Sequence, residues 1–190
     1  MILESISLEI SRIMEIEPKA KILLDADVII HFIKGDLSGK LHEIFENKLY
    51  LIDIVFDEVF KSPSQRTIVE RMISIRFIEE IKLDESGNDV KMEYYRLTGP
   101  RGGNLGKGES AVLSYCRFNN DVVASSNISD IKNYCEQHSI TYLTTMDFLA
   151  EAFKNRLFSE HECDEFIQTV KRRGSKLVNG IDHIRNYRTR

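Results

Sequence analysis

The chain has 190 residues, of which 42% are hydrophobic and 29% are charged, and this composition excludes a fibrous or a wholly disordered protein. No apolar run approaches the roughly 20 residues that span a bilayer. The first residues lack the basic region and the small-residue cleavage site of a secretory signal. We therefore expect a cytoplasmic protein without a membrane partner. The three cysteines are widely spaced, which excludes a disulfide framework or a zinc site and predicts three buried thiols.

The net charge of −4 is unevenly distributed along the chain. Residues 171–190 contain seven basic side chains and one acid, so this tail carries +6 and the preceding body −10. This division fits a body that binds metal and an arm that contacts phosphates. It fits a solvated tail equally well, and the sequence leaves both interpretations open.

The first half of the chain alternates helical segments with short β-branched strands. Apolar residues at helical spacing over 1–17 predict a helix that Pro18 ends, with a face that suits packing on the domain, a homodimer or another partner. The strands expected after it are 22–24, 49–54 and 75–83. The expected helices are 28–34, 37–47 and 90–97, with a turn at 25–27 and a further helix start at 56–62 that breaks near Pro63.

A glycine-rich stretch, TGPRGGNLGKG at residues 98–108, is the strongest loop signal in the chain. It lacks the spacing of a phosphate-binding loop, so we interpret it as a lid or a helix lead-in. The helices expected after it are 109–120, 128–138, 147–158 and 159–173, and the strands are 121–125 and 140–144. This alternation predicts an α/β fold with a parallel sheet. We divide the chain into an N-terminal helix (1–18), the α/β domain (19–158) and a C-terminal helix with a basic tail (159–190).

Acidic or amide side chains follow the expected strands or open the next helix. They are Asp25, Glu58 at a helix start, Glu109 after the glycine-rich loop, Asn127, Asp130 and Asp147. Because the carboxyl ends of parallel strands meet at one edge of a sheet, we expect these side chains to converge. Oxygen ligands suit Mg²⁺ or Mn²⁺, and clustered carboxylates repel one another unless a cation joins them.

Each acid taken alone also fits a structural role. An aspartate at a helix start caps it, and a glutamate in a first turn compensates the helix dipole. Asp25, Asp27, Asp130 and Asp147 are each consistent with a capping role, and Glu58 and Glu109 with compensation of a helix dipole.

Several motifs together resemble a known family, the PIN domains, over about residues 20–155. KILLDADVIIHF resembles their opening strand–Asp–helix unit, and VFDEV resembles their second acidic motif. GKGESAVLSYC, DVVASSNISDI and ITYLTTMDFL follow in the order found in PIN-like proteins with a G-x-G-E helix. No single motif is specific, but their order and spacing together are characteristic.

The resemblance implies a three-layer α/β/α fold with a central parallel sheet of about five strands. It also implies a metal-dependent endoribonuclease that cleaves RNA with Mg²⁺ or Mn²⁺, often as the toxin of a toxin–antitoxin pair, so an inhibitory antitoxin is an expected partner. By position in the motifs, the catalytic acids are Asp25, Glu58 and Glu109. The fourth position departs from the pattern, because Ser126-Asn127 stands where relatives often have Asp-Asp. Asp130, one helical turn further on, could take that role.

Such a site supports in-line attack of a metal-activated water on a phosphodiester. The expected metal ligands are Asp25, Glu58 and Glu109, completed by Asn127 or Asp130. Additional candidates are Asp27, Asp147 and Ser126. The expected contacts to the nucleic acid are Ser125 and Ser126, which could donate to phosphate, and Arg101 and Lys107.

Two other functions remain open. A PIN-like protein weakened at its fourth acid would bind only nucleic acid or a protein partner. Asp25-Ala-Asp27 after a buried strand also resembles the nucleophile motif of haloacid-dehalogenase-type phosphatases, in which one Asp is phosphorylated and the other acts as an acid. That family also uses a later lysine and an acidic pair, of which SNISD is a poor version.

Overall fold

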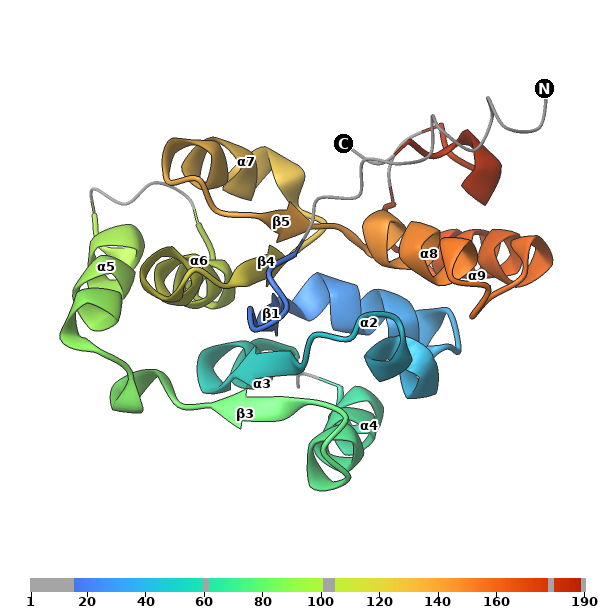
Figure 1. Ribbon diagram of the computed structural model, residues 1–190. Coiled ribbons are helices and arrows are strands. Elements are labelled where there is room, and N and C mark those ends of the chain that lie inside the picture. The colour runs from blue at the N-terminus through green and yellow to red at the C-terminus, as the bar shows by residue number, and fades with distance from the viewer. Residues whose placement is uncertain (1–15, 60–61, 101–104, 178–179, 189–190) are drawn as a thin grey trace.

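A five-stranded parallel sheet forms the centre of the protein in this computed structural model, which describes residues 16–59, 62–100, 105–177 and 180–188 (Figure 1). The strand order is β3-β2-β1-β4-β5, and every neighbouring pair is parallel. The strands are β1 (Ile22–Leu24), β2 (Leu49–Ile52), β3 (Glu79–Ile81), β4 (Val122–Ala124) and β5 (Tyr142–Leu143). All residues of β1 and β4 are buried, as expected for central strands that helices cover on both faces.

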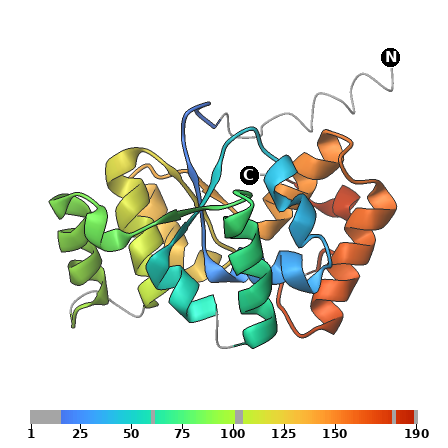
Figure 2. The ribbon, with the colours of Figure 1, turned by 90° about the horizontal axis from the view of Figure 1, so that it is seen from below.

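Helices cover both faces of this sheet. The α-helices are α2 (Ala26–Lys34), α3 (Asp53–Val59), α4 (Pro63–Ser74), α5 (Asn88–Thr98), α6 (Lys107–Asn119), α7 (Ile128–Gln137), α8 (Thr145–Lys154) and α9 (Glu160–Arg172). The described residues also form the 3-10 helices η1 (Ser38–Glu43), η2 (Leu83–Glu85) and η3 (Ile184–Asn186). In Figures 1 and 2, α5 and α6 lie on one side of the sheet and α2, α4, α8 and α9 on the other. This is the three-layer α/β/α architecture that the sequence predicted.

The C-terminal helix α9 belongs to the hydrophobic core. The ring of Phe166 lies 5.0 Å from that of Phe32 on α2, and a side chain at Gly35 would overlap it. The glycine that ends α2 is therefore required by this close approach. Cys116, Cys135 and Cys163 are free and buried, which confirms the expected thiols.

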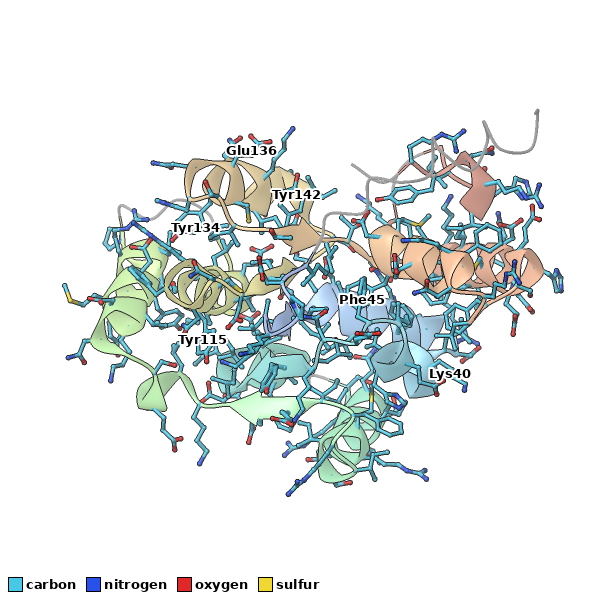
Figure 3. All side chains as sticks on the ribbon, viewed as in Figure 1. Lys40, Phe45, Tyr115, Tyr134, Glu136 and Tyr142 are labelled. Atoms are coloured by element: carbon cyan, nitrogen blue, oxygen red, sulfur yellow. The ribbon has the colours of Figure 1, made fainter. Side chains whose placement is uncertain are left out.

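A cluster of charged side chains around the buried Glu93 joins the helices on the other face of the sheet. Glu93 of α5 accepts hydrogen bonds from Arg96, from Arg117 of α6 and from the hydroxyl of Tyr134 on α7. Figure 3 shows the Tyr134 side chain where these helices meet. The two guanidinium groups and the hydroxyl hold the pKa of the Glu93 carboxyl low, at about 2, although burial opposes this.

Several local predictions were wrong. Residues 37–47 contain only the 3-10 helix η1, and α3 begins at Asp53 directly after β2 instead of near residue 56. Pro63 does not merely break a helix; it is the first residue of α4, where its missing N–H needs no partner. Asp27 lies inside the first turn of α2, not in the loop before it. The helix expected over 1–17 lies almost wholly outside the described residues.

Candidate active site

Asp25 is buried where β1 ends and α2 begins. Its Oδ1 accepts the N–H of Ala26 at 2.8 Å, and its Oδ2 accepts the hydroxyl of Ser125, from the end of β4, at 3.0 Å. The N–H of Asn127 donates to the Ser125 oxygen at 3.2 Å, which leaves the Ser125 proton for Asp25. Burial, together with the charges of Asp27 and Glu109, raises the pKa of Asp25 to about 8. Asp25 is both the helix cap and a carboxyl group with a strongly perturbed pKa.

Asp27 is the second carboxyl group at this sheet edge. Its Oδ2 accepts the N–H of Ser126 at 2.8 Å. Its Oδ1 is buried and has no hydrogen-bond partner among the described residues. Burial raises the pKa of Asp27 to about 6, the charge of Glu109 adds to the rise, and the Ser126 N–H opposes it. An ionised, buried oxygen without a donor is unfavourable and needs a positive partner.

Asn127 links two of the predicted acids. Its Nδ2 donates to Oε1 of Glu109 and to Oδ2 of Asp130, each at 2.7 Å, and its Oδ1 accepts the Ser129 hydroxyl at 3.1 Å. The other Glu109 oxygen accepts the N–H of Gly106 at 3.0 Å and so caps α6. Glu109, Asn127 and Asp130 therefore lie side by side, as the sequence predicted, with an amide between the two carboxylates.

Glu58 reaches the same helix start from a different direction. It lies in the last turn of α3, not at a helix start as the sequence suggested, because α3 begins at Asp53. Its Oε1 accepts the N–H of Gly108 at 3.0 Å, and a Cβ at Gly108 would come within 2.5 Å of its Oε2. The G-x-G-E motif thus has a physical explanation: Gly106 is the cap, Gly108 admits Glu58, and Glu109 closes the cap.

A hydroxyl network that the sequence did not predict lies behind Asp27. The Ser126 hydroxyl accepts the N–H of Thr145 at 3.0 Å and lies 2.8 Å from the Thr145 hydroxyl. The Thr145 hydroxyl also lies 2.8 Å from Nδ1 of His31, which is one helical turn after Asp27 on α2. Burial lowers the pKa of His31 to about 4, so the imidazole is neutral at physiological pH. The only signal for this network in the sequence is the placement of His31 and Asp27 on one face of a helix.

The remaining candidates lie apart from this group or outside the described residues. Asp147 caps α8: its Oδ2 accepts from the N–H and the hydroxyl of Thr144, and its Oδ1 accepts from Tyr187. Lys107 is the exposed first residue of α6, and no ion pair of Lys107 occurs within the described residues. Arg101 falls in the stretch 101–104, which the structure does not describe.

The donor chemistry of the site fits a hard divalent cation. The converging side chains carry carboxylate and hydroxyl oxygens beside the Asn127 amide, and burial, with the charge of Glu109 adding to it, raises the pKa of both Asp25 and Asp27. No Lys or Arg from the described part of the chain pairs with either aspartate. Within the same residues, no group of three or more His, Cys, Asp or Glu side chains is placed to hold a metal ion. Glu58 and Glu109 are instead held by backbone N–H groups of α6.

Comparisons with known proteins identify no family for this chain. No family model matches the chain, and no curated protein matches it. Among solved structures, the chain is similar to one in the crystal structure of VapBC2 from Rickettsia felis bound to a DNA fragment from their promoter. The two are 14% identical, the alignment covers 65% of this chain and 97% of the other, and the TM-score is 0.44. No helix in the described ranges is long and apolar enough to cross a membrane.

Proposed function

We propose that this protein is a metal-dependent endoribonuclease that hydrolyses RNA phosphodiester bonds with Mg²⁺ or Mn²⁺. The observation that carries the proposal is the buried Oδ1 of Asp27, which lacks a hydrogen-bond partner in the described part of the chain and lies in the same site as Asp25. Two carboxyl groups in such surroundings hold protons unless a cation balances them. A divalent cation would serve this purpose.

The chain's own residues then divide into ligands and supports. Asp25 and Asp27 would bind the cation directly, with Glu109 as a third ligand. Glu58, Asp130 and Asn127 would act through bound water, since Mg²⁺ keeps several waters when proteins bind it. The bound cation would supply an activated water and polarise the phosphate. Ser125 and Ser126 hold the two aspartates in place through their hydroxyl and N–H groups.

The choice of RNA as substrate rests on the resemblance to PIN domains. Lys107, exposed at the start of α6 two residues before Glu109, adds a side chain that would contact the phosphates of any nucleic acid. The role of toxin and an inhibitory antitoxin partner are proposed on the same resemblance alone, and a homodimer is proposed on the apolar face that the sequence predicts for residues 1–17.

A second candidate is a PIN-like protein that binds nucleic acid or a partner without cleaving it. The position of the Asn127 amide between Glu109 and Asp130 favours this alternative, because an amide there takes up both carboxylates without a cation. The phosphatase alternative is less favoured: α2 begins at Ala26, and Asp27 already lies within its first turn.

Single-turnover cleavage of labelled RNAs, structured and unstructured, tests the proposal when Mn²⁺, Mg²⁺ or EDTA is added. DNA of the same sequences tests the choice of substrate. The variants are Asp25→Asn and Glu109→Gln, and Glu165→Gln on the exposed side of α9 is the matched control. We expect Mn²⁺-dependent RNA cleavage that both site variants lose and the control keeps, with folding checked by circular dichroism. Absence of cleavage, together with equal Mn²⁺ binding by the wild type and Asp25→Asn, would exclude the nuclease and leave the binding protein.

A further inference from the structure

Residues 180–188 form a strap along the C-terminal half of the protein, here called the C-terminal strap. Its 3-10 helix η3 contacts α8 and α9 (Figure 1, red). Ile184 is 3% exposed and belongs to the core. The backbone N–H of Ile184 donates to Oδ1 of Asp164 on α9 at 2.7 Å. The strap is therefore a packed part of the domain.

The charges of the strap and of α9 hold it in this position. Arg185 pairs with Glu160 at 2.8 Å, Asp182 with Lys171 at 2.8 Å, and His183 with Asp164 at 2.7 Å. Two basic side chains of residues 171–190, Lys171 and Arg185, thus form ion pairs at the surface of the protein. The strap packs through Ile184, while the side chains of Asp182, His183 and Arg185 stay 59%, 64% and 69% exposed, as the solvated interpretation of the tail expects.

The strap ends at the first turn of α8. The hydroxyl of Tyr187 donates to Oδ1 of Asp147 at 2.8 Å and lies 3.3 Å from the Thr144 hydroxyl. Asp147 and Thr144 form the capping box of α8, at the carboxyl end of β5. Tyr187 therefore adds a third group to the cap and ties the chain terminus to this edge of the sheet.

One peptide bond and a set of hydrogen bonds connect this cap to the candidate site. Thr145, the residue after Thr144, is fully buried and bonds to the Ser126 hydroxyl through both its N–H and its own hydroxyl. The N–H of Ser126 in turn donates to Asp27. A shift of the α8 start would therefore move Ser126, and with it the hydrogen bond of 2.8 Å that its N–H donates to Asp27.

We propose that Tyr187 is a positioning residue: the C-terminal strap acts through the α8 cap and the Thr145–Ser126 contact to hold Asp27 in place for cation binding. The part of this inference that concerns the cation rests on the proposed function. The part that concerns the position of Ser126 does not.

The test compares full-length Tyr187→Phe with Tyr95→Phe, a matched control whose ring is 66% exposed on α5. Mn²⁺ affinity is measured by titration calorimetry with the metal alone, and amide exchange is followed by NMR. We expect Tyr187→Phe to weaken Mn²⁺ binding at least about threefold, less than the roughly 10- to 100-fold typical of groups that touch a ligand directly. We also expect faster exchange at the Ser126 N–H. The control should leave both unchanged.

The exchange data separate positioning from simple helix capping. If Tyr187 only caps α8, exchange rises at the first-turn amides of that helix and stays unchanged at Ser126, and the proposal is overturned. An unchanged Mn²⁺ affinity in a folded Tyr187→Phe, when the wild type does bind Mn²⁺, overturns it as well. If the wild type binds no Mn²⁺ but Ser126 responds, the proposed function fails while the positioning of Asp27 stands. Thr145→Ser, which keeps the hydroxyl, should behave as wild type, and Thr145→Val should behave as Tyr187→Phe.

Discussion

The side-chain amide of Asn127 donates to Oε1 of Glu109 at 2.7 Å, and its second hydrogen goes to Oδ2 of Asp130 at the same distance. Both carboxylates can only accept when ionised, so the NH₂ group must face them and both its hydrogens are used. The neutral amide of Asn127 thus does part of what a bound cation would do, because it joins two carboxylates that would otherwise repel each other.

Asn127→Asp should therefore make the stability of the folded protein depend more strongly on a bound metal ion. Three carboxylates would meet where an amide now donates, and the loss of two hydrogen bonds to charged groups should lower the free energy of unfolding without metal by about 2 kcal/mol. Mn²⁺ should restore stability to a larger extent than in the wild type. Urea unfolding with and without Mn²⁺ measures both effects. Asn127→Ala, which removes the amide between Glu109 and Asp130 but adds no charge, is the control. An equal gain in the free energy of unfolding on addition of Mn²⁺ in all three proteins would contradict the interpretation.

The stability of the metal-free protein should fall as the pH rises from about 4 toward 8. The pKa values of Asp25 and Asp27 are raised to about 8 and about 6 in the folded state, above the value of about 3.9 in an unfolded chain. The folded protein therefore binds protons that the unfolded chain has released, and this contribution is complete below pH 4 and is lost as the pH passes the folded-state values.

Comparison of the wild type with Asp25→Asn isolates this effect, because the other titrating groups are shared. Without metal, Asp25→Asn should have a higher free energy of unfolding than the wild type at pH 8. This difference in stability should shrink toward pH 5. Thermal unfolding in EDTA at several pH values measures it. A difference that does not depend on pH would show that Asp25 is ionised in the folded protein.

The order of elements and the sheet edge could be predicted because they depend on local patterns. Buried β-branched triplets such as 22–24 mark the strands, and parallel strands bring their carboxyl ends to one edge. This was enough to anticipate that Glu109, Asn127 and Asp130 would lie together. The same reasoning could not separate Asp147 from them, since a capping aspartate and a ligand occupy the same place in a sequence.

Contacts between distant segments could not be predicted. Glu58 was expected at a helix start, but the sequence does not show that α3 begins at Asp53, whose side chain also accepts the N–H of Leu83 from beyond β3. The link from Tyr187 to Asp147 joins residues 40 positions apart. Such contacts depend on how whole layers pack, and no local period in the sequence reports them.

Gly108→Ala should move Glu58 away from the start of α6. The new Cβ would lie 2.5 Å from Oε2 of Glu58, so the side chain must leave the Gly108 N–H. Alanine favours a helix over glycine by about 1 kcal/mol, which offsets part of the loss. We expect a net decrease of about 1 kcal/mol in the free energy of unfolding, together with weaker RNA cleavage.

A double-mutant cycle with Glu58→Ala tests the cause of this decrease. Without the Glu58 carboxylate, Gly108→Ala should become neutral or stabilising, which gives a coupling free energy of about 1 to 2 kcal/mol. Gly39→Ala, where nothing lies within 4 Å of the new Cβ, is the control for a glycine change with free space. Additive effects at positions 58 and 108 would mean that the close approach has no energetic consequence.

Glu93→Gln should destabilise the face of the sheet that carries α5 and α6. The carboxylate accepts from Arg96, Arg117 and Tyr134, and removing its charge leaves two guanidinium groups without their partner, which should lower the free energy of unfolding by about 3 kcal/mol at pH 7. The folded-state pKa of Glu93, about 2, lies below the unfolded value of about 4.3. The stabilising contribution of the carboxylate is therefore present above about pH 4.3 and is lost as the pH falls toward 2.

Urea unfolding at pH 7 and pH 3 should therefore show a smaller difference in the free energy of unfolding between wild type and Glu93→Gln at the lower pH. Glu136→Gln, an exposed change on α7 whose pair with Lys132 is 3.7 Å long, should show almost no difference at either pH. An equal loss from Glu93→Gln at both pH values would place the energy in packing instead of in the charge of this cluster.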